Sequence, residues 1–163
     1  LLRASLQCGD PVVYMEHKTL WGAEGPVDES VTIPLGQAAV RRAGSDITIV
    51  SWSKQALVCA AACDTLAAQG IQAELIDLRT IWPWDRDTVL ASAAKTGRLL
   101  VVHEAIQAAG FGAEIAATAA EATGCKISRL GAPRIPVGYA PVLEAQSRVT
   151  ADAIVARVQQ LLA

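Results

Sequence analysis

The sequence predicts an α/β fold, a three-layer α/β/α sandwich built on a five-stranded, mostly parallel sheet with one antiparallel strand. Two observations carry this prediction. Strand-like and helix-like segments alternate from residue 37 to the end of the chain, which is the order that right-handed βαβ crossovers produce. In addition, the run Leu99–Val102 is apolar at every position, as expected of a strand buried on both faces of a parallel sheet.

The first two strands are predicted to be short. Ala38–Arg42 has strand character, the small residues that follow form a turn, and Asp46–Trp52 is the second strand. A hairpin-like return at this turn would make the first strand antiparallel to the others. A helix over Lys54–Gln69 comes next, and its apolar face consists of Cys59, Ala62, Cys63 and Leu66.

The alternation continues with a strand at Ile71–Leu78 and a helix at Asp85–Thr96 that stops at Gly97. The face of this helix predicted to turn inward carries Val89, Leu90, Ala93 and Ala94. The later elements are a strand at Leu99–His103, a helix at Gly112–Thr123, a strand at Lys126–Leu130, a long loop at Gly131–Arg148 and a final helix after an N-cap at Thr150.

Composition excludes several classes of function. The net charge of −2, with no basic cluster between aromatic residues, argues against nucleic-acid binding. No apolar run approaches the roughly 20 residues of a membrane span. The four cysteines form no C-x-x-C motif and only two histidines are present, which argues against a zinc site and a disulfide framework. A reducing compartment is therefore expected.

The first 36 residues are expected to be separate from the domain that follows. Leu1–Gln7 has the pattern of the end of an amphipathic helix, and Val12–Met15 has strand character. Residues 17–34 contain glycines, prolines and mixed charges, as is typical of a connector. We therefore expect a boundary between 1–36 and 37–163, irregular packing of the first part, and a longer polypeptide of which this chain is the C-terminal part.

Candidate functional residues follow the ends of predicted strands, where open α/β sheets bind ligands. His103 ends a buried strand and is either catalytic, with Glu104 beside it as an orienting partner or an acid, or a hydrogen-bonded histidine at a domain interface. Asp77 and Arg79 end the preceding strand. Structural ion pairs with groups elsewhere in the protein are favoured over binding of a carboxylate or phosphate by the arginine. Asp85 starts the next helix.

Two further features leave alternatives open. Gly110 and Gly112 precede a helix, where backbone N–H groups can bind an anion, but close packing of helix and sheet explains them better. Trp82 and Trp84 flank a proline after a strand, and both a protein contact surface and packing over the sheet edge would account for them.

Taken in combination, these motifs resemble a known family. The runs DLRT-x-x-P-x-D (residues 77–85), KTGRLLVVHEA (95–105) and GFGAEIAA (110–117) are similar to the C-terminal domain of transketolase-like enzymes. The form is most similar to the beta subunit of thiamine-diphosphate-dependent 2-oxo acid dehydrogenases of the pyruvate, acetoin and branched-chain type. Further similar segments lie at residues 11–22, 33–53 and 130–144.

The resemblance implies an oxidoreductase that decarboxylates pyruvate or a related 2-oxo acid and transfers the acyl group to lipoyl groups. It implies thiamine diphosphate and Mg²⁺ held by the alpha subunit and the beta subunit's pyrimidine-binding domain, of which residues 1–36 would be the tail and connector. The implied partners are the alpha subunit, the second beta subunit of a heterotetramer and the acyltransferase core. The implied location is the bacterial cytoplasm or the mitochondrial matrix.

The same resemblance assigns no catalytic, cofactor-binding or metal-binding residue to this chain, because the family's active residues lie earlier in the beta subunit. We therefore expect this part alone to be inactive and to leave the cofactor unbound. The candidate residues become interface or structural residues: Asp77, Arg79, Asp85, His103, Glu104, Gly110 and Gly112. The alternatives are the C-terminal domain of transketolase or deoxyxylulose-phosphate synthase, or a stand-alone anion-binding α/β module.

Overall fold

A computed structural model describes all 163 residues and contains one five-stranded sheet. The strands are, in chain order, β1 (Ala39–Arg42), β2 (Ile47–Ser51), β3 (Ala73–Asp77), β4 (Arg98–Ile106) and β5 (Lys126–Ala132). They lie side by side in the order β1-β3-β2-β4-β5, with β1 antiparallel to β3 and every other pair parallel. The predicted sheet, mostly parallel with one antiparallel strand, is confirmed.

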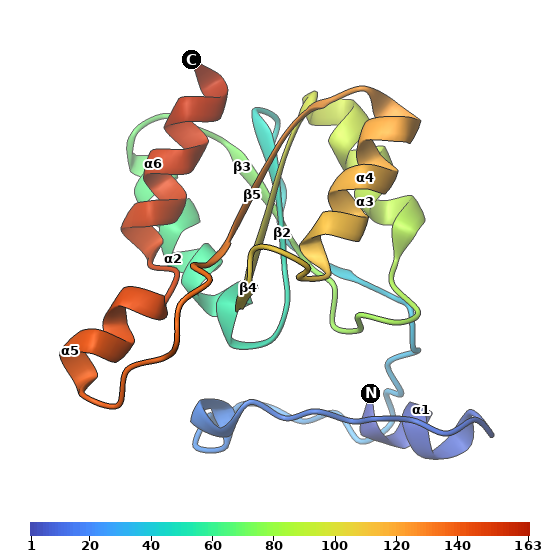
Figure 1. The fold of residues 1–163 in the computed structure, drawn as a ribbon. Helices are drawn as coiled ribbons and strands as arrows, with labels where there is room; N and C mark the ends of the chain where they lie inside the picture. Colours follow the sequence, from blue (N-terminus) through green and yellow to red (C-terminus); the bar gives the residue numbers. More distant parts are fainter.

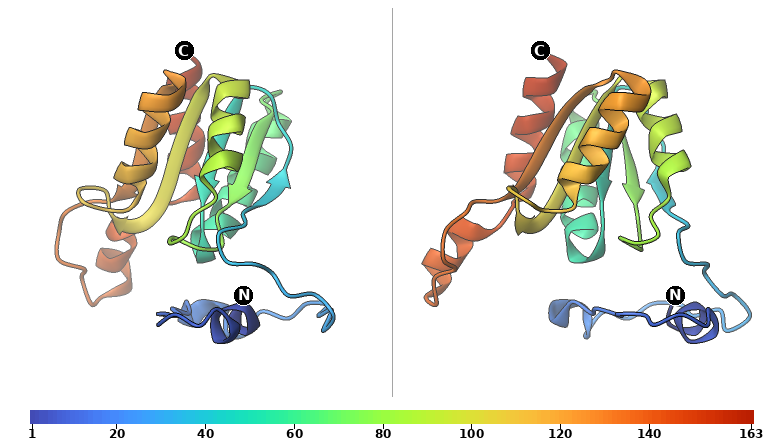
Figure 2. Two further views of the ribbon diagram at one scale, coloured as in Figure 1. Left: turned by 90° about the vertical axis from the view of Figure 1, so that its right-hand side faces the viewer. Right: turned by 45° about the vertical axis from the view of Figure 1, so that its right-hand side comes forward.

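Two pairs of helices cover the two faces of the sheet. The helices are α2 (Ser53–Ala68) and α6 (Ala151–Leu162) on one face, and α3 (Arg86–Thr96) and α4 (Gly112–Thr123) on the other (Figure 1 and Figure 2). Successive strand residues point to opposite faces. Ile47 and Ile49 therefore enter the core beneath α2 and α6, whereas Val50 enters the core beneath α3 and α4. The predicted three-layer sandwich is confirmed.

The predicted hairpin between the first two strands is wrong. β1 pairs with β3, in a register that places Ala39 opposite Asp77. Both sides of the buried strand β2 are occupied by parallel neighbours, β3 and β4, so no side is left for β1. The edge position suits β1, because Arg41 and Arg42 place charge on a strand that would otherwise invite further pairing.

Caps define the helix ends as the sequence predicts. The Asp85 carboxylate accepts a hydrogen bond from the Thr88 N–H (3.1 Å) at the start of α3, and Gly97 ends that helix in the left-handed region, at φ 68°. At the start of α6, the Thr150 hydroxyl accepts from the Ala153 N–H (3.2 Å). One predicted face is partly wrong, because Ala94 is exposed.

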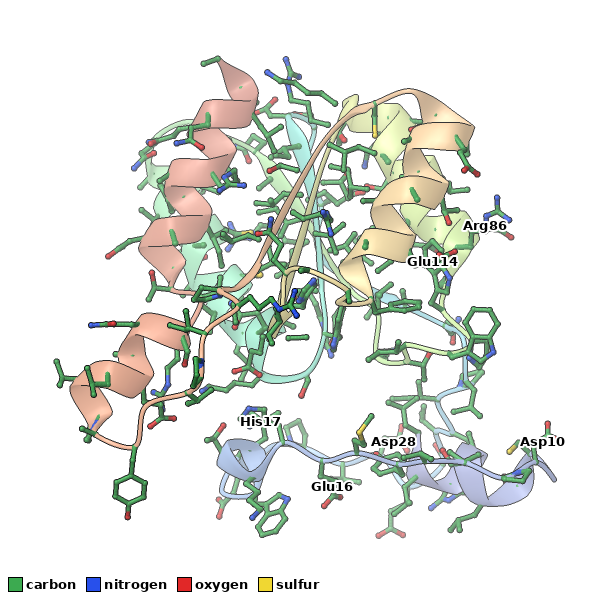
Figure 3. All side chains as sticks on the ribbon, in the orientation of Figure 1. Asp10, Glu16, His17, Asp28, Arg86 and Glu114 are labelled. Atoms are coloured by element: carbon green, nitrogen blue, oxygen red, sulfur yellow. The ribbon has the colours of Figure 1, made fainter.

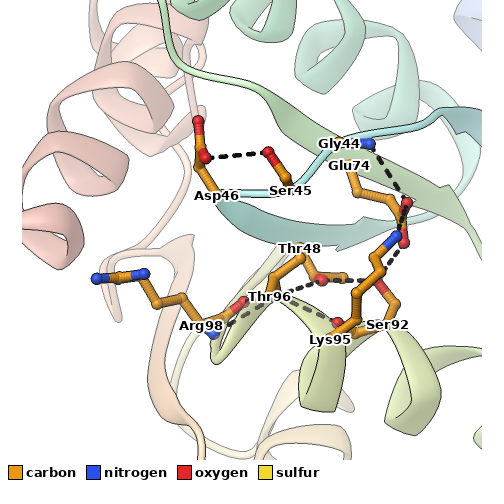
Figure 4. A network of polar contacts seen from close by, with 9 residues as sticks. All are labelled: Gly44, Ser45, Asp46, Thr48, Glu74, Ser92, Lys95, Thr96 and Arg98. Atoms are coloured by element: carbon orange, nitrogen blue, oxygen red, sulfur yellow. Dashed lines mark hydrogen bonds and ion pairs between the residues drawn. The ribbon is translucent and has the colours of Figure 1, made fainter.

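The inward side of α3 instead carries hydroxyl groups that belong to a polar network with no counterpart in the sequence prediction (Figure 4). Thr48 of β2 makes hydrogen bonds with Ser92 (2.6 Å) and Thr96 (2.8 Å). The carboxylate of Glu74 accepts from Ser92 and from the ammonium group of Lys95. Burial would raise the pKa of Glu74, but these hydrogen bonds outweigh it and hold the pKa below its usual value.

Two segments differ from their predicted form. The predicted loop at Gly131–Arg148 contains a short helix, α5 (Pro141–Glu144), followed by a 3-10 turn at Ala145–Ser147. Proline in the first turn of α5 favours this start, because its fixed φ matches the helix and its missing N–H is not needed there. Val12–Met15 is not a strand, since no neighbouring strand lies beside it to supply hydrogen bonds.

The residues before β1 lie across the end of the sandwich instead of joining it. They comprise α1 (Leu2–Gln7), a 3-10 turn at Lys18–Leu20 and otherwise irregular chain, and none of them is buried. Figure 1 and Figure 2 show this segment as a separate strip beneath the carboxyl ends of the parallel strands. No helix of the structure has the length and apolar character needed to cross a membrane.

Candidate functional site

The carboxyl ends of β2, β3 and β4 meet at one edge of the sheet and bring the candidate residues together. Between this edge and the strip of residues 1–36 lies a cavity of about 1570 Å³, lined mainly by apolar side chains. Asp77, Arg79 and Glu104 line it, as do Trp52 and Trp82. The arrangement matches the general rule that open α/β sheets place their binding residues beyond the carboxyl ends of strands.

Asp77 forms an ion pair with a residue from another strand, Arg41. The guanidinium of Arg41 donates two hydrogen bonds to the Asp77 carboxylate, at 2.8 and 3.2 Å, across the β1–β3 pair. The other carboxylate oxygen accepts from the backbone N–H of Arg79 (3.1 Å). Arg79 itself sits at φ 61° and makes no ion pair. Asp77 therefore fixes the turn after β3, and the Arg79 side chain is left at the cavity.

Asp85 and Thr80 tie the start of β1 to the same edge. Asp85 accepts from the backbone N–H of Ala38 (2.9 Å) as well as capping α3. Burial raises the pKa of Asp85, but the bonds from Ala38 and Thr88 outweigh it and lower the pKa below the usual value. Thr80 accepts from the Gly36 N–H (3.0 Å) and donates to the Pro83 carbonyl (2.7 Å). Both groups therefore act as structural ties.

His103 is almost completely buried, with 1% of its surface exposed. Its Nδ1 lies 3.0 Å from the carbonyl oxygen of Ala105, so Nδ1 carries the proton and donates it. The ring stacks on Trp52, with centroids 5.5 Å apart, and Nε2 has no hydrogen-bond partner. Burial lowers the pKa of His103, which favours the neutral ring.

Three glycines surround this ring. A Cβ atom at Gly110, Gly112 or Gly131 would lie 2.5, 2.6 or 2.7 Å from a ring atom of His103. The ring occupies the space in front of the first turn of α4, where an anion would have to sit. The geometry therefore favours close packing as the reason for Gly110 and Gly112.

Glu104 points away from the His103 ring and its three glycines, toward residues 1–36 beneath the sheet. Its carboxylate lies 3.1 Å from Nε2 of His17 and 3.9 Å from Nζ of Lys54. The Nδ1 of His17 accepts from the N–H (3.3 Å) of Thr19, so Nε2 is the donor to Glu104. Figure 3 shows His17 turned toward the sandwich and Glu16 turned away from it. Residues 1–34 make no other side-chain hydrogen bond or ion pair with the sandwich.

The donor set of this edge does not fit a diphosphate–Mg²⁺ group. No three His, Cys, Asp or Glu side chains come together in a way that could hold a metal ion. Asp77 and Glu104 are already engaged by cationic or hydrogen-bonding partners from this chain. We therefore derive no catalytic step from these residues.

Sequence reasoning missed several contributors to this edge. Arg41 lies in the predicted first strand, three residues after its start, but no pattern there marks it as the partner of Asp77. Gly131 follows the predicted strand Lys126–Leu130 directly, although the strand itself extends past it to Ala132, and a glycine at the end of a predicted strand is the available signal. His17 gave no signal, because its partner Glu104 is far away in the sequence.

The close packing of Gly110, Gly112 and Gly131 around the His103 ring predicts that a side chain at Gly112 destabilises the fold. Replacing Gly112 with alanine should lower the free energy of unfolding by about 2 kcal/mol, because the new methyl group would overlap a ring that cannot move. Urea denaturation followed by circular dichroism measures this change. In a His103→Ser background the ring is absent, and the same substitution should cost at least about 1 kcal/mol less. If the stability losses of Gly112→Ala and His103→Ser were strictly additive, the Gly112 methyl group would not be in contact with the His103 ring.

Comparison with known proteins identifies related sequences. The family model for the transketolase C-terminal domain matches residues 36–154. The 2-oxoisovalerate dehydrogenase subunit beta 2 of Arabidopsis thaliana, a mitochondrial protein, is 47% identical over 74% of this chain and 34% of its own length. The acetoin:2,6-dichlorophenolindophenol oxidoreductase subunit beta of Bacillus subtilis is 38% identical over 99% of this chain and 49% of its own length.

A rice protein and a solved structure extend the comparison. The mitochondrial pyruvate dehydrogenase E1 component subunit beta-2 of Oryza sativa is 37% identical over 95% of this chain and 44% of its own length. A split-gene transketolase, solved as an inactive beta4 tetramer, has a TM-score of 0.77 and 26% identity, over 86% of this chain and 47% of that one. The chain thus spans between a third and a half of the length of these relatives.

Proposed function

Because this chain belongs to the transketolase C-terminal domain family, we propose that it is the C-terminal part of the beta subunit of a 2-oxo acid dehydrogenase. Its role in that subunit is assembly, not chemistry. The observation that carries this proposal is that the acidic and imidazole groups of the carboxyl edge are engaged within the chain. Asp77 is held by Arg41, Glu104 by His17 and Lys54, and His103 is buried.

Exposed apolar side chains around the cavity support an assembly role. Val13, Met15, Trp21 and Trp82 are each at least two-thirds exposed, and all four line the cavity. A monomeric protein rarely leaves so many large apolar groups on one face, because covering them is favourable. Aromatic residues and methionine are also enriched where proteins meet. This face is therefore proposed as a subunit contact.

The complete enzyme is proposed to decarboxylate pyruvate or a related 2-oxo acid and to pass the acyl group to lipoyl groups. Thiamine diphosphate supplies the carbanion-stabilising chemistry in such an enzyme. Its proposed partners are an alpha subunit, a second beta subunit in a heterotetramer and the acyltransferase core. The proposed division is residues 1–36 as the end of a pyrimidine-binding domain with its connector and 37–163 as the assembly domain. The proposed location is the bacterial cytoplasm or the mitochondrial matrix.

A second candidate is the C-terminal domain of a transketolase. The similarity in fold to the split-gene transketolase favours it. The matches to beta subunits at 37–47% identity favour the first candidate more strongly. Under either candidate the chain has the same structural role, and the substrate would be chosen by parts of the enzyme outside this chain.

The proposal is tested by activity and self-association measured on the same preparation. The pure chain should show no turnover of pyruvate with thiamine diphosphate and Mg²⁺, and sedimentation velocity should show association that increases with concentration. Trp82→Glu should weaken this association at least several-fold, because the charge would enter the proposed contact. Val27→Glu is the matched control, since Val27 is equally exposed but lies outside the cavity lining. Turnover by the chain alone, or a monomer at all concentrations, would contradict the proposal.

A further inference from the structure

The loop after β4 is held in place at both of its ends. Gln107 is fixed to β5 through its N–H, which donates to the Ala132 carbonyl (2.9 Å), and through its own carbonyl, which accepts from Arg129 (3.1 Å). At the other end of the loop, Phe111 packs edge-on against Trp52, with centroids 6.3 Å apart. The loop is therefore closed over the end of the sheet from both sides.

The middle of this loop is strained. Ala109 has a φ of 63°, in the left-handed region that residues with a Cβ atom seldom adopt. Such a conformation persists only where surrounding contacts maintain it. The neighbouring Gly110 rests directly on the His103 ring, where a Cβ atom would lie 2.5 Å from Cε1. The ring is therefore the surface against which the strained loop is held.

The free nitrogen of that ring faces the wrong environment for a positive charge. Nε2 is buried without a partner, and it lies against Gly110 and Gly112 at the start of α4, which is the positive end of that helix. A proton on Nε2 would create a buried cation there. The charged or titratable groups on the surrounding elements are Glu104 on β4, Arg129 on β5 and Glu114 on α4. Lys54 on α2 and His17 of residues 1–36 also lie nearby, and both bind Glu104.

None of these groups would neutralise the cation. Glu104 is directed to His17 and Lys54, and Glu114 is exposed on the first turn of α4. Arg129 is itself positive and makes protonation of the ring less favourable. A proton on the ring can therefore be accommodated only if Nε2 reaches water, and Gly110 of the loop covers it together with Gly112 at the start of α4.

We propose that the loop Gln107–Phe111 is an acid-operated latch, which is closed while the His103 ring is neutral and opens when Nε2 takes a proton from solvent. Opening brings the new charge to water, relieves the left-handed conformation of Ala109 and uncovers Phe111 and Trp52. The Nδ1–H bond to the Ala105 carbonyl remains in both states, because Nδ1 is the donor in each. The latch does not depend on the proposed function.

Nuclear magnetic resonance of the full chain tests the latch, since only two histidines are present. At neutral pH the His103 ring should be the Nδ1–H tautomer, and it should take up its second proton below pH 6.5. The ¹⁵N heteronuclear NOE of residues 106–112 should fall with the same midpoint, because that quantity reports fast backbone motion. An Nε2–H tautomer, or a ring that titrates while these NOE values stay constant, would overturn the proposal.

Two variants separate the latch from general acid unfolding. His103→Asn keeps an N–H donor for the Ala105 carbonyl but cannot titrate, so the loop should keep its neutral-pH NOE values down to pH 5. His17→Gln removes the other histidine and should leave the transition unchanged. A transition that survives in the His103 variant or disappears in the His17 variant would refute the latch. Should the His103 variant not fold, the wild-type titration and the His17 variant still decide.

Discussion

Replacing Gly44 with alanine should destabilise the protein more than any other single methyl group added to it. A Cβ atom at this position would lie 2.3 Å from the backbone carbon of Ala73 and 2.3 Å from the backbone nitrogen of Glu74. Both are main-chain atoms of β3, so no side chain can rotate away. We expect the free energy of unfolding to fall by about 3 kcal/mol and the melting temperature by roughly 6–12 °C.

The reason lies in how the chain enters the central strand. The N–H groups of Ser45 and Asp46 both donate to the Gln72 carbonyl, at 2.9 and 3.0 Å, so the turn before β2 rests on the start of β3. Added bulk at Gly44 would push this turn away and break those bonds. Thermal denaturation by circular dichroism measures the loss.

Gly25→Ala is the matched control for this substitution. Gly25 has no atom within 4 Å of its Cβ position and no positive φ, so alanine there should change stability by less than about 0.5 kcal/mol. A Gly44 variant that is as stable as the Gly25 variant would show that the turn does not press on β3 as described.

Periodicity and capping made the layers of the fold predictable. The run Leu99–Val102 has no polar residue because both of its faces meet helices, and the pattern therefore carried the information about burial. Gly97 and Thr150 signal helix ends through local chemistry that needs no distant partner. Properties that depend on neighbours in sequence were thus correctly read.

Contacts between distant residues were not predictable in this way. The position of β1 beside β3 depends on which sides of β2 are free, and no pattern within Ala39–Arg42 contains that information. The same holds for Asp77, which lies two residues from Arg79 in sequence but binds Arg41 from another strand. The strand predicted at Val12–Met15 failed because its composition fits a strand but no partner lies beside it.

At the candidate site, too, local features could be predicted from the sequence and contacts between distant residues could not. A sequence can mark His103 as the end of a buried strand, but the three glycines around its ring lie in the loop after β4, at the start of α4 and within β5. The resemblance to a family placed His103, Gly110 and Gly112 in its motifs without giving their geometry. What the structure adds is their common environment, because Gly110 and Gly112 together with Gly131 leave room for the His103 ring.

The second large effect is expected at the polar network beneath α3. Lys95→Met should lower the free energy of unfolding by about 2 kcal/mol near neutral pH, because it leaves the Glu74 carboxylate inside the protein without its cation. The Glu74 side chain is only 5% exposed, whereas Lys95 is 51% exposed. The loss is therefore smaller than for a pair in which both groups are buried. Urea is the suitable denaturant, since it does not screen charges.

The exposed pair between Arg42 and Asp64 provides the control. Removing its cation by Arg42→Met leaves Asp64 in water, with 72% of its side chain exposed. That substitution should cost no more than about 0.5 kcal/mol. Equal losses in the two variants would mean that burial of the carboxylate does not decide the effect.

The loss at Lys95 should also depend on pH in a definite direction. In the wild-type protein the hydrogen bonds to Glu74 overcome its burial, so the folded-state pKa lies below the usual 4.5. A depressed pKa contributes stability that is present above the unfolded-state value and is lost as the pH falls through the folded-state value. In the Lys95 variant burial prevails and raises the folded-state pKa of Glu74 above its unfolded-state value, so the buried carboxylate destabilises the fold near neutral pH. That loss should be relieved as the pH falls through the raised folded-state pKa. At low pH, where Glu74 is protonated in both proteins, the free energies of unfolding of the wild type and the Lys95 variant should converge. A difference between them that stays constant over the whole pH range would contradict the assignment of the effect to Glu74.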